Sequence, residues 1–137
     1  MRFAALLLFA VVAAHAEEID VVGLKKRAEI LVDRWGVPHI YARTFDDAFV
    51  AQGFNAARDR LFQIDLWRRR GLGQLSEVLG PQYIEQDKAT RLFLYRGDME
   101  KEWSSYGPQA RRMATAFVAG INAYIDWLAA AVDRVPV

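Results

Sequence analysis

Nucleophilic catalysis needs a hydroxyl, thiol or amine together with a base that takes its proton. This sequence of 137 residues has no cysteine and only two histidines, His15 and His39. A zinc site or a histidine relay needs several such side chains placed together, so we expect neither. His39 follows Pro38 in a short apolar run, and we expect it to be structural, forming a hydrogen bond that fixes a hairpin.

The remaining nucleophile candidates are hydroxyl groups. After residue 16 the chain carries three serines and three threonines, which are Ser76, Ser104, Ser105, Thr44, Thr90 and Thr115. The sequence identifies no base that would activate any of them. We therefore predict no catalytic residue, no cofactor-binding residue and no metal-binding residue in this chain.

Acidic residues are the third group that could do chemistry, as ligands of a cation. Calcium is usually held by about six to eight oxygen ligands around one point, and no loop here gathers that many. We therefore expect no cofactor within this segment. The acidic residues weighed for such a site are Glu77, Glu85, Asp87, Asp98, Glu100 and Glu102.

A basic run beside an aromatic side chain, Trp67 to Arg70, has the composition of a nucleic-acid-binding patch. Asp59 and Asp65 lie nearby, and Asp65 precedes Arg69 by one helical turn, the favourable order for an ion pair. Over the whole chain, 18 Lys and Arg stand against 17 Asp and Glu. Because phosphate binding needs an uncompensated basic surface, we predict an ion-pair network here and no nucleic-acid partner.

The first 16 residues have the pattern of a secretory signal peptide. Arg2 is followed by an apolar run from Phe3 to Ala14, and Ala14, His15 and Ala16 form a small-any-small cleavage motif. The apolar run is shorter than the roughly 20 residues that span a bilayer. We expect cleavage after Ala16, a mature region over residues 17–137 in the periplasm or outside the cell, and no membrane association after removal of the signal.

The elements that would position any site begin with a hairpin. Glu29–Asp33 and His39–Ala42 are rich in branched and aromatic residues, and Gly36 between them suits a turn. The sequence therefore predicts a hairpin over about residues 29–43. Two strands alone are marginally stable in water, so the hairpin needs a packing partner.

A long helix is expected next. Thr44 precedes Asp47 by three residues, the spacing of a capping box, which places the helix start near Phe45. Gly71 and Gly73 suit its end, because glycine readily adopts the left-handed backbone of a helix stop. The buried face is expected to be the apolar stripe of Val50, Phe54, Ala57, Leu61 and Ile64.

The rest of the chain to about residue 131 also reads as helical. We expect one or two turns over Gln74–Leu79, a helix over Pro81–Tyr95 with Asp87 spaced to pair with Arg91, a short helix capped by Asp98, and a long final helix. Gly120 inside that final helix predicts close approach of another element. Eight aromatic residues are expected to be core: Phe54, Phe62, Trp67, Phe93, Trp103, Phe117, Tyr124 and Trp127.

Three motifs in this order carry a family resemblance. They are DRWGVPHIYA at Asp33–Ala42, AARDRLFQ at Ala56–Gln63 with the residues that follow it to Gly80, and the patterned helix Arg111–Leu128. Together they resemble the opening part of the penicillin acylase family of N-terminal-nucleophile hydrolases, which cut amide bonds between an acyl group and an amine.

The resemblance implies a complete enzyme of αββα architecture, cut from a precursor into two chains. Its nucleophile would be the first serine of the larger chain, typically followed by asparagine and, two positions later, tryptophan. Ser76, Ser104 and Ser105 do not match that pattern, so no catalytic residue is carried over. The resemblance also makes calcium possible in the complete enzyme.

The sequence thus predicts an α+β fragment, mostly helical with an N-terminal hairpin, from the smaller chain of an exported acylase. Its partner would be the larger chain of the same precursor, and an N-acyl amide such as a beta-lactam side chain or an acyl-homoserine lactone would be a substrate only of the complete enzyme. Alone, the fragment is expected to be inactive. The alternative is a free-standing helical periplasmic module that binds a protein through the apolar faces of its first and last helices.

Overall fold

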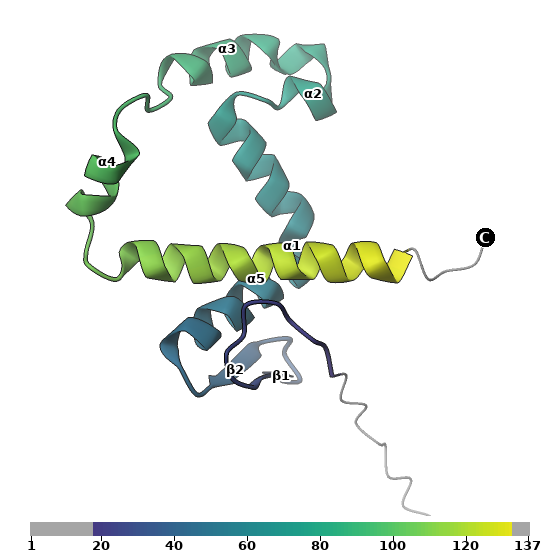
Figure 1. Ribbon diagram of the computed structural model, residues 1–137. Helices are drawn as coiled ribbons and strands as arrows, with labels where there is room; N and C mark the ends of the chain where they lie inside the picture. The colour runs from purple at the N-terminus through teal and green to yellow at the C-terminus, as the bar shows by residue number, and fades with distance from the viewer. Residues whose placement is uncertain (1–17, 133–137) are drawn as a thin grey trace, which may run out of the picture.

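The computed structural model describes residues 18–132; the predicted signal peptide lies outside the described residues. Figure 1 shows a small hairpin followed by a series of helices, which confirms the predicted α+β class with its mostly helical character. The elements are β1 (Ala28–Val32), β2 (Pro38–Ala42), α1 (Phe45–Leu72), α2 (Ser76–Leu79), the 3-10 helix η1 (Pro81–Tyr83), α3 (Ile84–Leu92), α4 (Met99–Ser105) and α5 (Ala110–Val132).

Strands β1 and β2 form the predicted antiparallel hairpin, with Ile30 opposite Ile40. Its turn is built around the side chain of Asp33, whose Oδ1 accepts hydrogen bonds from the backbone amides of Trp35 and Val37, each at 2.9 Å. Gly36 has a positive φ of 80°, which explains why glycine suits this position. The hairpin packs against the first part of α1.

Helix α1 starts and ends as its capping residues dictate. The Thr44 hydroxyl accepts a hydrogen bond from the Asp47 amide at 3.1 Å, and Gly73 closes the helix in the left-handed conformation at φ 66°. Gly71, also considered as a stop, remains helical. The backbone departs from helical geometry at Arg60, and this kink separates two parts of the helix with different surroundings.

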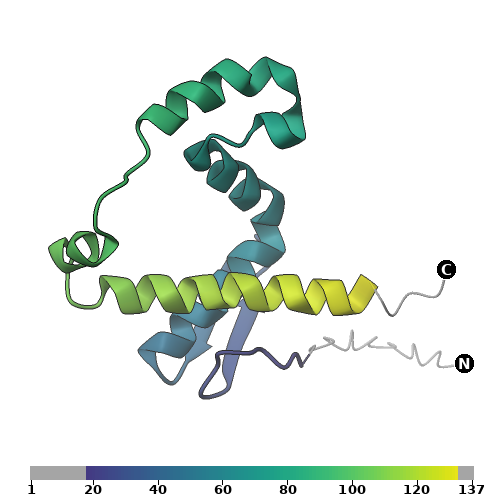
Figure 2. The same cartoon turned by 45° about the horizontal axis from the view of Figure 1, so that its top comes forward.

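The first part of α1 crosses α5, and the core lies at this crossing (Figure 2). Phe54 meets the ring of Tyr124 edge-on, with 5.3 Å between the ring centres. Gly120 lies directly against the α1 backbone, which confirms the close approach predicted for it. Fully or nearly fully buried apolar residues at or near the crossing are Val50, Ala51, Phe54, Ala57 and Ala123.

Beyond Arg60 the chain forms an arm, defined here as residues 61–98, that projects from this core (Figure 1). The predicted helix Pro81–Tyr95 begins as the 3-10 helix η1, continues directly as α3 and ends at Leu92, which is earlier than predicted. The predicted Asp87–Arg91 pair does not form a direct ion pair: Asp87 binds the start of α2, and Arg91 donates from Nε to the Gly73 carbonyl at 2.8 Å. Arg91 still attracts Asp87 electrostatically.

The aromatic residues of the arm correct a further prediction. Phe62, Trp67 and Phe93 were expected in the core, but they are 72%, 67% and 88% exposed. The arm has only one layer of helices here, and no second layer among residues 18–132 covers these rings. The prediction holds fully for Phe54, whereas Trp103, Phe117, Tyr124 and Trp127 are half-buried.

Candidate functional site

The hydroxyl groups weighed as nucleophiles mostly serve local structure. Ser104 and Ser105 donate to the carbonyls of Lys101 and Glu102, each at 2.7 Å, which is the usual back-bonding within a helix. Ser76 donates from Oγ to Asp87 at 2.6 Å. These hydrogen bonds fix helix ends and turns, and none of them joins a hydroxyl to a histidine or lysine.

His39 makes the hydrogen bond expected of it. Its Nε2 lies 3.2 Å from Oδ2 of Asp33, the carboxylate that also organises the hairpin turn. Hydrogen bonds from the Val37 amide and from His39 outweigh the opposing effect of burial and lower the pKa of Asp33. The pair therefore links β2 to the turn, and both groups lie on the surface of the hairpin.

The most strongly buried polar group is the carboxylate of Asp47, in the first turn of α1. It is 0% exposed and accepts hydrogen bonds from the Thr44 hydroxyl at 2.6 Å and from the Lys25 amide at 2.7 Å. Burial alone would raise the pKa of Asp47, but these hydrogen bonds lower it. Asp47 therefore stays ionised and ties the segment before β1 to α1.

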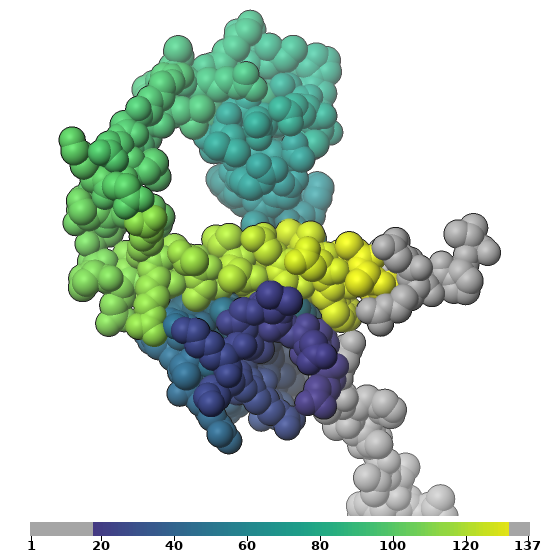
Figure 3. All heavy atoms as spheres, viewed as in Figure 1, coloured from purple at the N-terminus to yellow at the C-terminus, as the bar shows by residue number. Residues whose placement is uncertain are grey.

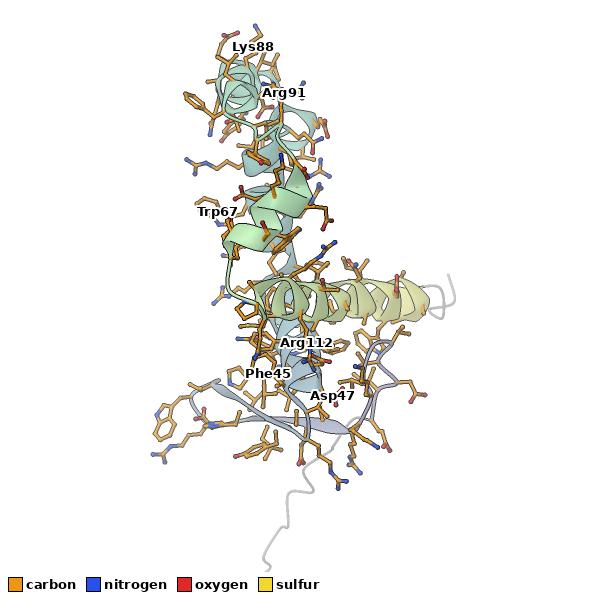
Figure 4. All side chains as sticks on the ribbon, turned by 60° about the vertical axis from the view of Figure 1, so that its left-hand side comes forward. Phe45, Asp47, Trp67, Lys88, Arg91 and Arg112 are labelled. Atoms are coloured by element: carbon orange, nitrogen blue, oxygen red, sulfur yellow. The ribbon has the colours of Figure 1, made fainter. Side chains whose placement is uncertain are left out.

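The neighbouring Asp46 completes an acidic junction with Asp47. Lys25 Nζ lies 3.1 Å from Asp46 Oδ2, and Arg112 Nη2 of α5 lies 2.9 Å from the same atom. Hydrogen bonds from Arg112 and Lys25 lower the pKa of Asp46. Figure 4 shows Asp47 and Arg112 close together beneath α5. The acidic junction thus joins three separate parts of the chain.

A shallow, open groove lies beside the acidic junction, between α5 and the segment before β1. Its floor is apolar and its rim is basic, but Lys25 and Arg112 are paired with Asp46, and Arg111 donates to both carboxylate oxygens of Glu100. The groove therefore offers no uncompensated cation to an anionic ligand. Its lining residues include Gly23, Val50, Thr115, Ala116 and Ala119.

Asp87 holds the arm together from the inside. It is 4% exposed and accepts hydrogen bonds from the amides of Leu75 and Ser76 at 3.0 and 2.8 Å. Burial opposes ionisation, yet the hydrogen bonds from Ser76 and Leu75 lower the pKa of Asp87. A residue of α3 thus caps the start of α2, a role that no local sequence spacing indicates.

Two of the three arginines in the basic run are ion-paired within the arm, which confirms the predicted ion-pair network. Arg69 bridges Asp65 at 2.7 Å and Glu77 at 3.0 Å, and Arg68 also binds Asp65. Arg70 lies over the ring of Trp67 at 5.1 Å. This network joins α1 to α2.

Neither a metal site nor a clear membrane span is found within the described residues. Within residues 18–132, no group of three or more histidine, aspartate or glutamate side chains is placed to hold a metal ion. Within the same residues, only α5 is long and apolar enough to cross a membrane by length and composition, which is weak support for a membrane span.

Comparison with known proteins connects these elements to enzymes. A family profile described as penicillin amidase matches residues 27–137. Penicillin acylase 2 proenzyme of Pseudomonas sp. (strain SE83) is 37% identical over 107 residues, covering 78% of this chain and 14% of that protein. Penicillin G acylase of Escherichia coli is 33% identical over 98 residues, covering 72% of this chain and 12% of that protein.

Two further similarities agree with these. Acyl-homoserine lactone acylase QuiP of Pseudomonas aeruginosa is 33% identical over 103 residues, covering 75% of this chain and 12% of that protein. The solved thermostable penicillin G acylase of Alcaligenes faecalis superimposes with a TM-score of 0.69 at 27% identity, covering 80% of this chain and 58% of the solved chain. This chain therefore spans only 12 to 14% of the length of these curated relatives.

Proposed function

Because this chain belongs to the penicillin amidase family, we propose that it is the N-terminal part of the smaller chain of an exported enzyme that hydrolyses N-acyl amides. The family match over residues 27–137 carries this proposal. The matched range spans the hairpin, the α1–α5 crossing and the arm.

The substrate class follows from the names of the relatives. They name penicillins and acyl-homoserine lactones, and both kinds of molecule carry an acyl group on an amide nitrogen. The reaction proposed is therefore hydrolysis of that amide bond to a carboxylic acid and an amine.

The role of the chain in this reaction is to support a partner. The hydroxyl groups of Thr44, Ser76, Ser104 and Ser105 form hydrogen bonds at helix ends and turns. The resemblance assigns the nucleophile to the first residue of a larger chain. One relative is named a proenzyme and is more than five times as long as this chain, whereas the solved relative chain is less than twice as long. These lengths support an enzyme that is made as a precursor and works as separate chains.

Transplantation tests this proposal. In a chimera, the 107-residue aligned segment of the Pseudomonas penicillin acylase 2 proenzyme is replaced by the corresponding residues of this chain. We expect a processed, two-chain protein that hydrolyses N-acyl amides. A soluble chimera that stays unprocessed and inactive, beside an active parent enzyme, would count against the proposal.

The alternative, a free-standing periplasmic interaction module, is favoured by the exposed apolar side chains on α1 and α5. The two proposals differ in the DNA that follows the codon for Val137. A reading frame that continues to a serine followed by asparagine supports the acylase, whereas a stop codon followed by an unrelated gene supports the module.

A further inference from the structure

Helix α5 is apolar on two sides. The side facing α1 contains Met113, Phe117, Gly120, Tyr124 and Trp127, at steps of four and three residues. A second series with the same steps is displaced by one residue, which turns it by about 100° around the helix. This outer stripe consists of Ala114, Val118, Ile121, Ile125 and Leu128.

The described part of the chain covers the outer stripe only in part, since Ala114 and Ile121 are half-buried and the other three residues are exposed. Val118, Ile125 and Leu128 are 49%, 42% and 37% exposed, and Figure 3 shows α5 as an open band of atoms across one face of the molecule. The described charged residues of α5 are Arg111 and Arg112 in its first turn and Asp126 on another side. A surface helix normally carries charged residues opposite its buried face, so α5 has the pattern of a helix between two layers.

A lipid bilayer fits the outer stripe poorly as its second layer. Arg112 binds Asp46, and Gly120 lies against the α1 backbone, so α5 is fixed to α1. Insertion of α5 would carry α1 with it, including the exposed charged residues Arg58, Asp59 and Arg60. Charged groups inside a bilayer cost several kcal/mol each.

The length of the relatives identifies a better occupant. This chain corresponds to 12 to 14% of each curated relative, so most of such an enzyme lies outside it and is available as a second layer. We propose that the outer stripe is a seam at which the smaller chain packs against the larger chain. This inference rests on the proposed function and adds the residues through which the two chains meet.

The test uses the chimera with two glutamates in the seam, Val118→Glu and Ile125→Glu. Thr115→Glu is the matched control, because it adds a carboxylate to an exposed position of the same helix outside the outer stripe. A carboxylate buried in an apolar interface is strongly unfavourable. We expect the dissociation constant between the smaller and larger chains to rise at least about tenfold in the double variant, which corresponds to about 1.4 kcal/mol, and to stay within about twofold in the control.

The outcomes separate the seam from the function. If the unmodified chimera is active and the double variant associates as well as the control, the seam is wrong and the proposed function stands. If the unmodified chimera is neither processed nor associated, the proposed function fails and the seam fails with it. Circular dichroism of the isolated chain checks that the double variant keeps its helices. The isolated chain is also tested for dimerisation and for binding to phosphatidylcholine vesicles. If the double variant abolishes either of these while the chimera carrying it still assembles, the outer stripe serves that other contact and the seam is wrong.

Discussion

Gly53 of α1 and Gly120 of α5 lie where the two helices cross, and each faces the backbone of the other helix. A Cβ atom on Gly53 would overlap the Phe117 carbonyl, and a Cβ atom on Gly120 would overlap the Val50 carbonyl. The overlapping atoms belong to the backbone, so they cannot move aside as a flexible side chain would. This reciprocal contact fixes the distance between the two helices that form the core.

Gly120→Ala should therefore destabilise the chain. Overpacking of this kind costs about 1 to 3 kcal/mol, which outweighs the gain of about 1 kcal/mol in helix propensity. Urea unfolding followed by circular dichroism measures the loss. Gly71→Ala is the matched control, because nothing lies within 4 Å of a Cβ there and the helix-propensity gain should leave stability equal or higher. Equal effects of the two substitutions would show that the crossing is not tightly packed.

Asp47→Asn should also lower the free energy of unfolding. The substitution keeps the shape of the side chain but removes the charge that accepts the bonds from Thr44 and Lys25, which costs about 1 to 3 kcal/mol for a buried group. Glu85→Gln is the control, since Glu85 is exposed and pairs only with Lys88, and its effect should stay within about 0.5 kcal/mol. The same urea titration compares them, and a loss no larger than that of the control would contradict the role of Asp47.

Acid should destabilise the fold through its carboxylates. The pKa values of Asp46, Asp47 and Asp87 are lowered from the ordinary value of 3.8, so these groups contribute stability that is fully present above that value. The contribution is lost as the pH falls through the lower pKa of the folded state. Unfolding free energy measured from pH 7 to pH 2 should fall steeply below about pH 4. In Asp47→Asn the fall should be shallower, and an unchanged slope would contradict the assignment.

Asp87→Ala should loosen the arm while the core stays folded. The amides of Leu75 and Ser76 lose their acceptor, so hydrogen exchange at the start of α2 should speed up by about tenfold or more. Exchange at the α1–α5 crossing should not change. Glu85→Ala, on the exposed side of α3, should leave both regions as they are, and faster exchange throughout the chain would show that the arm and the core unfold together.

The structural features that could be predicted from the sequence are those whose interacting residues lie close together along the chain. The capping of α1 by Thr44 and its end at Gly73 are local, and so is the ion pair between Asp65 and Arg69. Gly120 was identifiable because a glycine in the middle of an apolar helix needs a reason. The hairpin is also a local feature, because two short runs of branched and aromatic residues flank the turn at Gly36.

The features that were missed depend on contacts between distant residues. Asp87 caps α2 from another helix, and nothing in its own neighbourhood distinguishes it from an exposed acidic residue. Arg112 binds Asp46 across 66 positions of sequence. Phe62 and Phe93 have the spacing of core residues, but the second layer that would cover them is absent from the described residues. Helical periodicity shows which face is apolar and does not show what covers it.

Turnover of N-acyl amides distinguishes a supporting chain, which needs a partner, from a chain that is active alone. The isolated chain, and the chimera that joins it to the rest of the Pseudomonas proenzyme, are assayed with phenylacetyl, glutaryl and long-chain acyl amides as substrates. We expect no turnover by the isolated chain and release of the amine by the chimera. Turnover by the isolated chain that survives further purification, or a folded and processed chimera without activity, would contradict it.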